Sequence, residues 1–216
     1  PVHVVAHDWG SIQSWEAMSR PDATDHFASF TTISGPCLDH VGVLLRENIS
    51  HPTPRRALDT VLQSFFSTYI VLLHLPFGPT LISATLGSPG AWRRFLRLMD
   101  GTPAEQIVTA PSLRNDMRSG ARYYRANMVR KVSKPNPRTT NVPVLEMVNT
   151  RDFAVRTHLL RNTNRFAPDL TRLESPTTHW APTTNPGYVA DSIREFVRRI
   201  AARTSTATTP DRAAIR

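Results

Sequence analysis

The stretch VHVVAHDWGS, residues 2–11, decides the fold class of this 216-residue chain. Residues 2–6 form a continuous apolar, β-branched run, which is typical of a strand buried in a parallel sheet. The run stops at His7-Asp8-Trp9-Gly10, and residues 11–19 have the apolar spacing of a short helix. Small residues on both sides of Asp8 allow a sharp strand-to-helix turn that exposes the central side chain. The stretch therefore predicts an α/β fold with Asp8 at the carboxyl end of a strand.

The rest of the chain alternates between strand and helix patterns, with one long helical interruption. The predicted elements are a strand at 27–34, helices at 55–75, 90–99 and 112–132, strands at 142–148 and 170–173, and a closing helix at 186–202. This order predicts a parallel sheet with an inserted helical cap. We expect the core to comprise residues 1–40 and 141–203, the cap to comprise 41–140, and 204–216 to form a polar tail.

Composition excludes several classes of protein. The longest apolar stretch, roughly residues 62–86, is broken by polar residues and prolines, so no transmembrane segment is expected. The chain starts without a basic and apolar leader pattern, and we expect a cytoplasmic location. Its one cysteine, Cys37, excludes an intramolecular disulfide framework and a Cys-only zinc site. His7 beside Asp8 does not indicate a metal, because neighbouring strand residues point to opposite faces. We expect no metal and no cofactor.

The net charge of +9 is carried almost entirely by arginine. Of the 26 basic residues only Lys131 and Lys134 are lysines, and the arginines are scattered along the chain. No basic strand interleaved with aromatic residues and no recognition helix accompanies this charge. We therefore expect no nucleic-acid partner.

Three titratable residues follow predicted strands or occupy the loops between elements. Asp8 ends the first strand, Asp152 lies just past the strand at 142–148, and His179 lies in the loop before the closing helix. Each has an ordinary alternative, since Asp8 could cap the next helix, Asp152 could form an Asx turn, and a loop histidine is often solvated. Together they have the order nucleophile, acid, histidine of the α/β-hydrolases.

These residues carry a family resemblance. The segments Ala6-His7-Asp8-Trp9-Gly10-Ser11 and His179-Trp180-Ala181-Pro182, with the Asp152 loop, resemble the epoxide hydrolase branch of the α/β-hydrolases over nearly the whole chain. The nearest resemblance is to the hydrolase module of actinobacterial proteins that fuse an epoxide hydrolase to a short-chain dehydrogenase. It implies a covalently fused dehydrogenase domain in the parent protein, with residues 204–216 as the start of an interdomain linker.

The resemblance also assigns two tyrosines of the cap. In this branch one tyrosine stands seven residues before a proline, as Tyr69 does before Pro76. The second family tyrosine lies in a stretch similar to Tyr123-Tyr124-Arg125, and the resemblance gives its role to Tyr124. Each could instead be a packing residue. The implied reaction uses a small epoxide and water: Asp8 attacks the epoxide, Tyr69 and Tyr124 protonate its oxygen, and an ester forms.

Hydrolysis of that ester needs a base and an oxyanion donor. The resemblance implies His179 as base, Asp152 as the group that orients it, and the Trp9 backbone N–H as one oxyanion donor. Family members carry further strands and an H-G-x-P turn upstream, with a second donor, and the sequence lacks both. We expect this chain alone to be impaired, since one lost donor costs ~10²–10³ in rate, and we expect residues 2–5 to form an exposed apolar edge.

Two other functions stay open. A haloalkane dehalogenase shares the aspartate nucleophile but holds its halide with nitrogen donors, and Trp92 is the one tryptophan of the predicted cap. A non-catalytic basic fragment that binds polyanions is the non-enzyme alternative. The apolar cap sequence indicates a hydrophobic epoxide as substrate.

Overall fold

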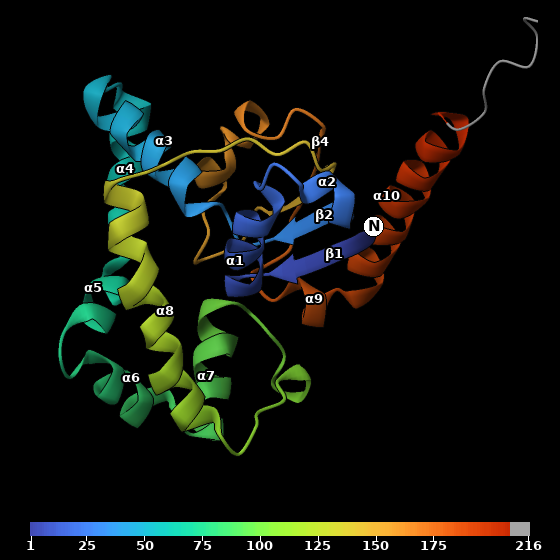
Figure 1. Ribbon diagram of the computed structural model, residues 1–216. Helices are drawn as coiled ribbons and strands as arrows, with labels where there is room; N and C mark the ends of the chain where they lie inside the picture. The colour runs from blue at the N-terminus through green and yellow to red at the C-terminus, as the bar shows by residue number, and fades with distance from the viewer. Residues whose placement is uncertain (208–216) are drawn as a thin grey trace, which may run out of the picture.

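Four parallel strands form the centre of the computed structural model, which describes residues 1–207 of the chain (Figure 1). The strands are β1 (Val2–His7), β2 (Phe27–Ile33), β3 (Val144–Asn149) and β4 (Leu170–Ser175), and they lie in that order in the sheet. Each is paired in parallel with the next. Their carboxyl ends therefore meet at one edge, and the predicted parallel α/β sheet is confirmed.

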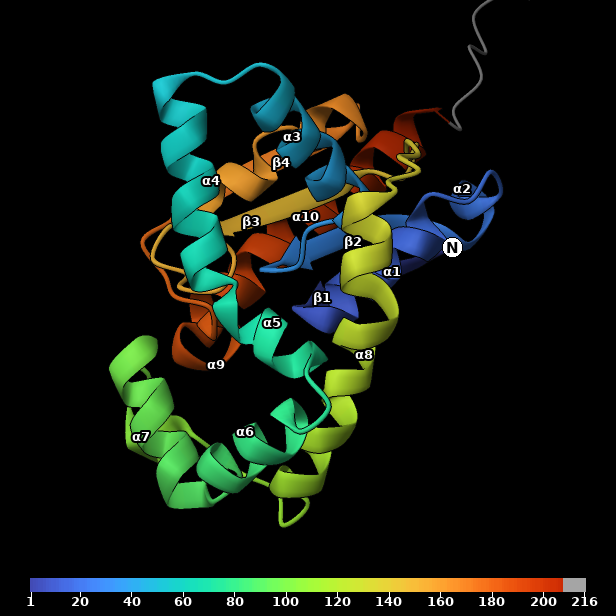
Figure 2. The ribbon, with the colours of Figure 1, turned by 90° about the vertical axis from the view of Figure 1, so that its left-hand side faces the viewer.

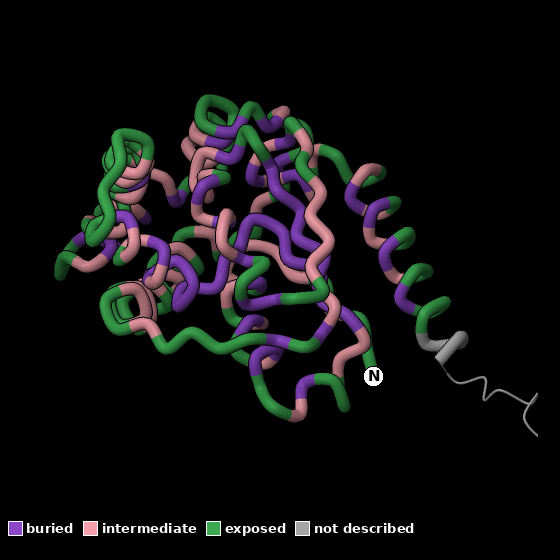
Figure 3. The backbone as a smooth tube through the Cα atoms, turned by 90° about the horizontal axis from the view of Figure 1, so that it is seen from above, coloured by how far each residue is buried: buried purple, intermediate pink, exposed green. Residues whose placement is uncertain are grey.

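Helices cover both faces of this sheet. One apolar cluster joins α1 (Trp9–Met18) to the sheet and includes Trp15, Met18, Phe30, Val142 and Val144. A second cluster joins α10 (Pro186–Ala207) to the other face and includes Ile33, Leu145, Met147, Phe196 and Ile200. Adjacent strand residues point to opposite faces, which explains why β2 and β3 contribute to both clusters. Along α10, buried and exposed residues alternate, as a helix lying on a sheet requires (Figure 3).

β1 differs from the predicted buried strand. It pairs with β2 on one side, and within the described residues no strand pairs with its other side. Val2 and Val5 are 61% and 49% exposed. Continuous apolar sequence indicated burial on both faces, but burial also depends on what lies beyond the edge. The expected exposed apolar edge at residues 2–5 is thus observed.

Six helices between β2 and β3 form the helical insert. They are α3 (Leu38–Ser50), α4 (Pro54–Phe66), α5 (Thr68–His74), α6 (Gly78–Leu86), α7 (Pro89–Met99) and α8 (Leu113–Ser133) (Figure 2). The predictions at 90–99 and 112–132 match α7 and α8 closely. Shorter elements are α2 (Ala23–His26), α9 (Ala181–Thr184), and 3₁₀ turns at Ala104–Gln106, Thr157–Leu160 and Thr163–Arg165.

The single helix predicted at 55–75 is wrong, because α4 and α5 separate at Ser67. Next to this break, the Thr68 hydroxyl bonds to the carbonyl oxygens of Ser64 and Phe65, which competes with regular helix geometry. The sequence pattern also missed α3 and α6. Gly78 and Pro79 form the first turn of α6, where proline is well tolerated.

The predicted polar tail begins later than residue 204. Helix α10 continues to Ala207, four residues into that segment, and residues 208–216 of the predicted tail lie outside the described residues. Among the described helices, none is by itself long and apolar enough to cross a bilayer; α5 and α6 pass that test as a pair, bent by 118°.

Ion pairs fix the helical insert to the sheet region. Lys131 of α8 binds the carboxylate of Glu16 in α1, and Arg161 binds Asp59 of α4 at 2.7 Å; Lys131 also binds Asp39 of α3 and so joins two helices of the insert. The insert is therefore held over the carboxyl edge of the sheet, where the candidate residues lie.

Candidate active site

Asp8 occupies a strained turn between β1 and α1. Its backbone has φ 50° and ψ −124°, which is unfavourable for a residue with a side chain. Close packing enforces the turn at Gly35, where an added Cβ would lie 2.4 Å from the Asp8 carbonyl oxygen. At Gly10, by contrast, an added Cβ would meet open space. The small residue that this turn requires is thus Gly35, after β2, and not Gly10.

The turn presents Asp8 to the predicted histidine. Nε2 of His179 lies 3.8 Å from Oδ1 of Asp8, and Nδ1 of the same ring donates to Oδ2 of Asp152 at 2.9 Å. His179 and Asp152 are buried, while 38% of the Asp8 side chain is exposed. The structure therefore brings the three predicted residues together, with His179 between Asp152 and Asp8 and with Asp8 the most exposed of the three.

Charges around His179 outweigh its burial. Burial alone lowers the pKa of the imidazole, but the hydrogen bond to Asp152 and the negative charges of Asp152, Asp8 and Asp100 raise it above 6.5. Burial raises the pKa of Asp152. The hydrogen bond to His179, the charge of His179 and a backbone N–H donor outweigh this effect and lower the pKa below its usual value. The backbone N–H groups of Ala154 and Val155 bind Oδ1 of Asp152 at 2.7 and 2.8 Å. Asp152 is thus held as an anion that supports a protonated His179.

The predicted tyrosines face the same site from the helical insert. Tyr69 lies at the start of α5 and Tyr124 in α8, with ring centroids 5.8 Å apart, and both line one cavity with Asp8. Burial raises the pKa of both phenols, so both stay protonated at neutral pH. Tyr123, the neighbouring alternative, is 49% exposed and does not line the cavity. The assignment to Tyr124 therefore fits the geometry.

Trp9 begins α1 directly after Asp8. Its ring packs against Tyr124 with centroids 4.8 Å apart and also lines the cavity. As the first residue of a helix, its backbone N–H has no partner within that helix. The predicted oxyanion donor is therefore next to the candidate nucleophile.

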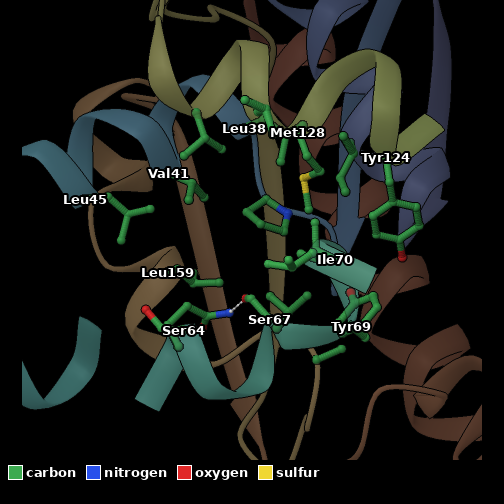
Figure 4. A pocket seen from close by; sticks show the side chains of 18 of the residues that line it. Leu38, Val41, Leu45, Ser64, Ser67, Tyr69, Ile70, Tyr124, Met128 and Leu159 are labelled. Atoms are coloured by element: carbon green, nitrogen blue, oxygen red, sulfur yellow. Dashed lines mark hydrogen bonds between the residues drawn. The ribbon is translucent and has the colours of Figure 1, made fainter. Parts of the chain in front are cut away.

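The cavity has a volume of about 380 Å³ and is mostly apolar. Figure 4 shows Tyr69 and Tyr124 at one end, with Leu45, Val41 and Leu159 toward the other. Within residues 1–207, no group of three or more His, Cys, Asp or Glu side chains is placed to hold a metal ion. The arrangement combines a carboxylate, a histidine–aspartate pair and two phenols around an apolar space.

Comparison with known proteins assigns the fold. No family model matches the chain. Its structure is similar to a Bacillus megaterium epoxide hydrolase crystallised with an inhibitor, with a TM-score of 0.64 at 17% identity, covering 91% of this chain and 69% of that chain. An epoxide hydrolase from Vigna radiata gives a TM-score of 0.58 at 18% identity, covering 92% and 69%. The chain has the α/β-hydrolase fold of the epoxide hydrolases.

A relative found by sequence bears the name of an oxidoreductase. The chain is 33% identical over 202 residues to the protein named "Probable oxidoreductase EphD" of Mycobacterium bovis and Mycobacterium tuberculosis. The alignment covers 91% of this chain and 34% of the relative, so the chain spans about a third of the length of these curated relatives.

One residue near the candidate site was missed by the sequence analysis. Asp100, at the end of α7, is only 4% exposed. Its Oδ1 accepts the backbone N–H of His179 at 2.9 Å, and its Oδ2 accepts the hydroxyls of Thr102 and Thr178 at 2.6 and 2.9 Å. A carboxylate of the helical insert thus holds the loop that carries His179.

The sheet holds the same loop from the other side. The Nε2–H of His7, the last residue of β1, donates to the carbonyl oxygen of His179 at 2.8 Å. Asn149, at the end of β3, donates to Ser34 at 2.9 Å and accepts the Thr177 hydroxyl at 2.7 Å. The positions of His7 and Asn149 at strand ends are the sequence signal for these roles.

Proposed function

We propose that this chain is the catalytic module of an enzyme that hydrolyses apolar epoxides to diols through an ester on Asp8. The observation that carries the proposal is the placement of Asp8 between His179, at 3.8 Å, and the cavity that Tyr69 and Tyr124 line. A carboxylate nucleophile opposite two phenols suits opening of a strained ring, because negative charge develops on the oxygen that leaves the attacked carbon.

In the first step, an Asp8 oxygen forms a bond to one epoxide carbon, and the bond from that carbon to the ring oxygen breaks. The oxygen keeps the electron pair and receives a proton from the phenols of Tyr69 and Tyr124. The product is an ester between Asp8 and a hydroxyalkyl group, with one phenol deprotonated.

In the second step, His179 removes a proton from a water that attacks the carbonyl carbon of the ester. Asp152 holds the imidazole in position and stabilises its protonated form, and the Trp9 N–H donates to the tetrahedral oxyanion. Collapse of this intermediate releases the diol, which takes the proton from His179. The second proton of the water restores the phenol, so that epoxide and water give the diol with the enzyme unchanged.

Dehalogenation is less well supported than epoxide hydrolysis. Trp92, the candidate halide donor, stacks on Phe95 and lines a different hollow with Leu96 and Trp180. It is not among the residues around the cavity that Asp8 lines. The groups of the insert that face Asp8 are phenols, which suit an epoxide oxygen.

Mass spectrometry of a trapped intermediate tests the proposal. In a His179→Gln variant, ester formation survives and ester hydrolysis is slowed by ~10²–10⁴. An apolar epoxide should then add its full mass to the peptide containing Asp8, with an Asp8→Asn variant as control. Unmodified Asp8 together with diol formation would refute the ester, and halide release from chloroalkanes that persists in Tyr69→Phe and Tyr124→Phe would favour a dehalogenase.

We also propose that a dehydrogenase domain accompanies this module in the native protein. The proposal is supported by the name of the mycobacterial relatives and by the third of their length that the chain spans. An antibody against this chain should detect a native polypeptide well above 24.2 kDa; a native band at that mass would contradict the fusion.

A further inference from the structure

The helical insert exposes an unusual amount of apolar surface along one side. Nine of the 17 exposed large hydrophobic side chains in the described part of the chain lie between residues 58 and 81, in α4, α5, α6 and the turn between α5 and α6, and two of the nine, Tyr69 and Val71, line the candidate active-site cavity. In α4, Leu58, Val61, Leu62 and Phe65 follow helical spacing and are 38–73% exposed. This helix therefore turns its apolar stripe to solvent, the reverse of an ordinary surface helix.

The same side continues through α5 and α6, which follow α4 along one flank of the molecule (Figures 1 and 2). Leu81 in α6 is 53% exposed, and Phe77, in the turn between α5 and α6, is 82% exposed. We call Leu58, Val61, Phe65, Phe77 and Leu81 the outer apolar face. Patches of this kind on a folded protein mark a surface that another partner covers.

Charge indicates which partner fits. Residues 60–92 contain no Asp, Glu, Lys or Arg. The segment follows Arg55-Arg56 and Asp59, which is paired with Arg161, and it precedes Arg93-Arg94. Residues 41–140 hold 14 basic against 5 acidic side chains. An uncharged apolar surface in a strongly cationic region is complementary to an anionic lipid surface. A second copy of this chain would instead bring two cationic surfaces together.

A cationic hollow lies beside the exposed Phe77. Arg118 and Arg122 of α8 line it together with Pro76 and Pro79, which flank Phe77 in the sequence. The hollow has a volume of about 300 Å³, and no carboxylate lines it. It can accept a phosphate group at the level where Phe77 would enter the acyl region of a bilayer.

We propose that the outer apolar face, formed by α4, α6 and the turn before α6, docks on the surface of an anionic lipid bilayer, with Arg118 and Arg122 binding lipid phosphates. The opposite faces of α4 and α5 carry Gln63, Ser64 and Tyr69 of the candidate active-site cavity. Docking does not depend on the proposed reaction, because it is measured without a substrate.

Vesicle co-sedimentation tests the docking. The chain should bind vesicles of phosphatidylcholine and phosphatidylglycerol, bind vesicles of phosphatidylcholine alone much more weakly, and lose affinity as salt is raised. Phe77→Ser should weaken binding about tenfold, and Arg118→Gln with Arg122→Gln about fivefold for each arginine. Val108→Ser, which removes a 92% exposed valine elsewhere, and Arg198→Gln are the matched controls and should bind like the parent.

Three outcomes would overturn the proposal. The first is no binding to the anionic vesicles. The second is that Phe77→Ser and the arginine variants bind the anionic vesicles as tightly as the parent and the two control variants do. The third is a dimer in analytical ultracentrifugation that Phe77→Ser dissociates, which would assign the outer apolar face to a second copy.

Discussion

Replacing the two cavity tyrosines by phenylalanine tests the role of the helical insert in ring opening. Tyr69 and Tyr124 both line the cavity with Asp8, so in the proposed reaction each can donate to the epoxide oxygen. Loss of one such donor typically costs ~10²–10³ in rate. We expect each single variant to lose about 10² in kcat/KM, because the other phenol remains, and the double variant to lose about 10⁴ or more.

The assay is diol formation by the full-length native protein from an apolar epoxide, with ester formation followed separately by mass spectrometry. Ester formation, and not only turnover, should be slowed, because the phenols act in the first step. Tyr123→Phe is the matched control, since this half-exposed tyrosine does not line the cavity. A double variant within about tenfold of the parent protein, with an unchanged thermal midpoint, would refute the assigned role.

Three further predictions concern the two carboxylates that bind His179 and the core beneath the site. Asp100→Asn removes a negative charge that raises the pKa of His179, so the fall of the ester-hydrolysis rate at acidic pH should move to lower pH. A pH–rate profile unchanged in single-turnover measurements would contradict this. Asp152→Asn should slow ester hydrolysis by ~10²–10⁴ and leave ester formation in place, and equal loss of both steps in rapid-quench experiments would argue against an orienting role. Phe30→Ala, at a fully buried position between the sheet and α1, should cost about 3–5 kcal/mol in urea unfolding; a loss below about 1 kcal/mol would contradict the packing described.

The direction of the His179 prediction follows from its protonation states. The imidazole acts as a base only when neutral, so ester hydrolysis falls as pH drops through its pKa, which is raised above 6.5. Negative charge stabilises the protonated form, and removing Asp100 charge therefore lowers that pKa. The rate at a given acidic pH then rises relative to the plateau.

The grouping of Asp8, Asp152 and His179 could be predicted because it depends on local features of the sequence. Asp8 ends an apolar run, Asp152 follows another, and His179 precedes the closing helix, so a parallel sheet alone places all three at one edge. The choice of Tyr124 over Tyr123 rested on the family resemblance, and the cavity geometry agrees with it.

Features that depend on distant partners were not predictable from one sequence. Asp100 lies at the end of a helix of the insert, and its partner His179 is 79 residues away, so no local pattern indicates the contact. The exposure of β1 depends on what lies beside it, and Gly35 is required because the chain passes close to the Asp8 backbone in three dimensions. Local pattern predicts elements, but the packing between them decides these positions.

Isotope labelling in a single turnover tests the central claim most directly. The full-length native protein, in excess over an apolar epoxide, is allowed to react in H₂¹⁸O, and the diol and the peptide containing Asp8 are weighed. Attack by Asp8 predicts ¹⁸O in the Asp8 carboxylate and an unlabelled diol in this first turnover. A labelled diol with unlabelled Asp8 would show direct attack by water and would contradict the account.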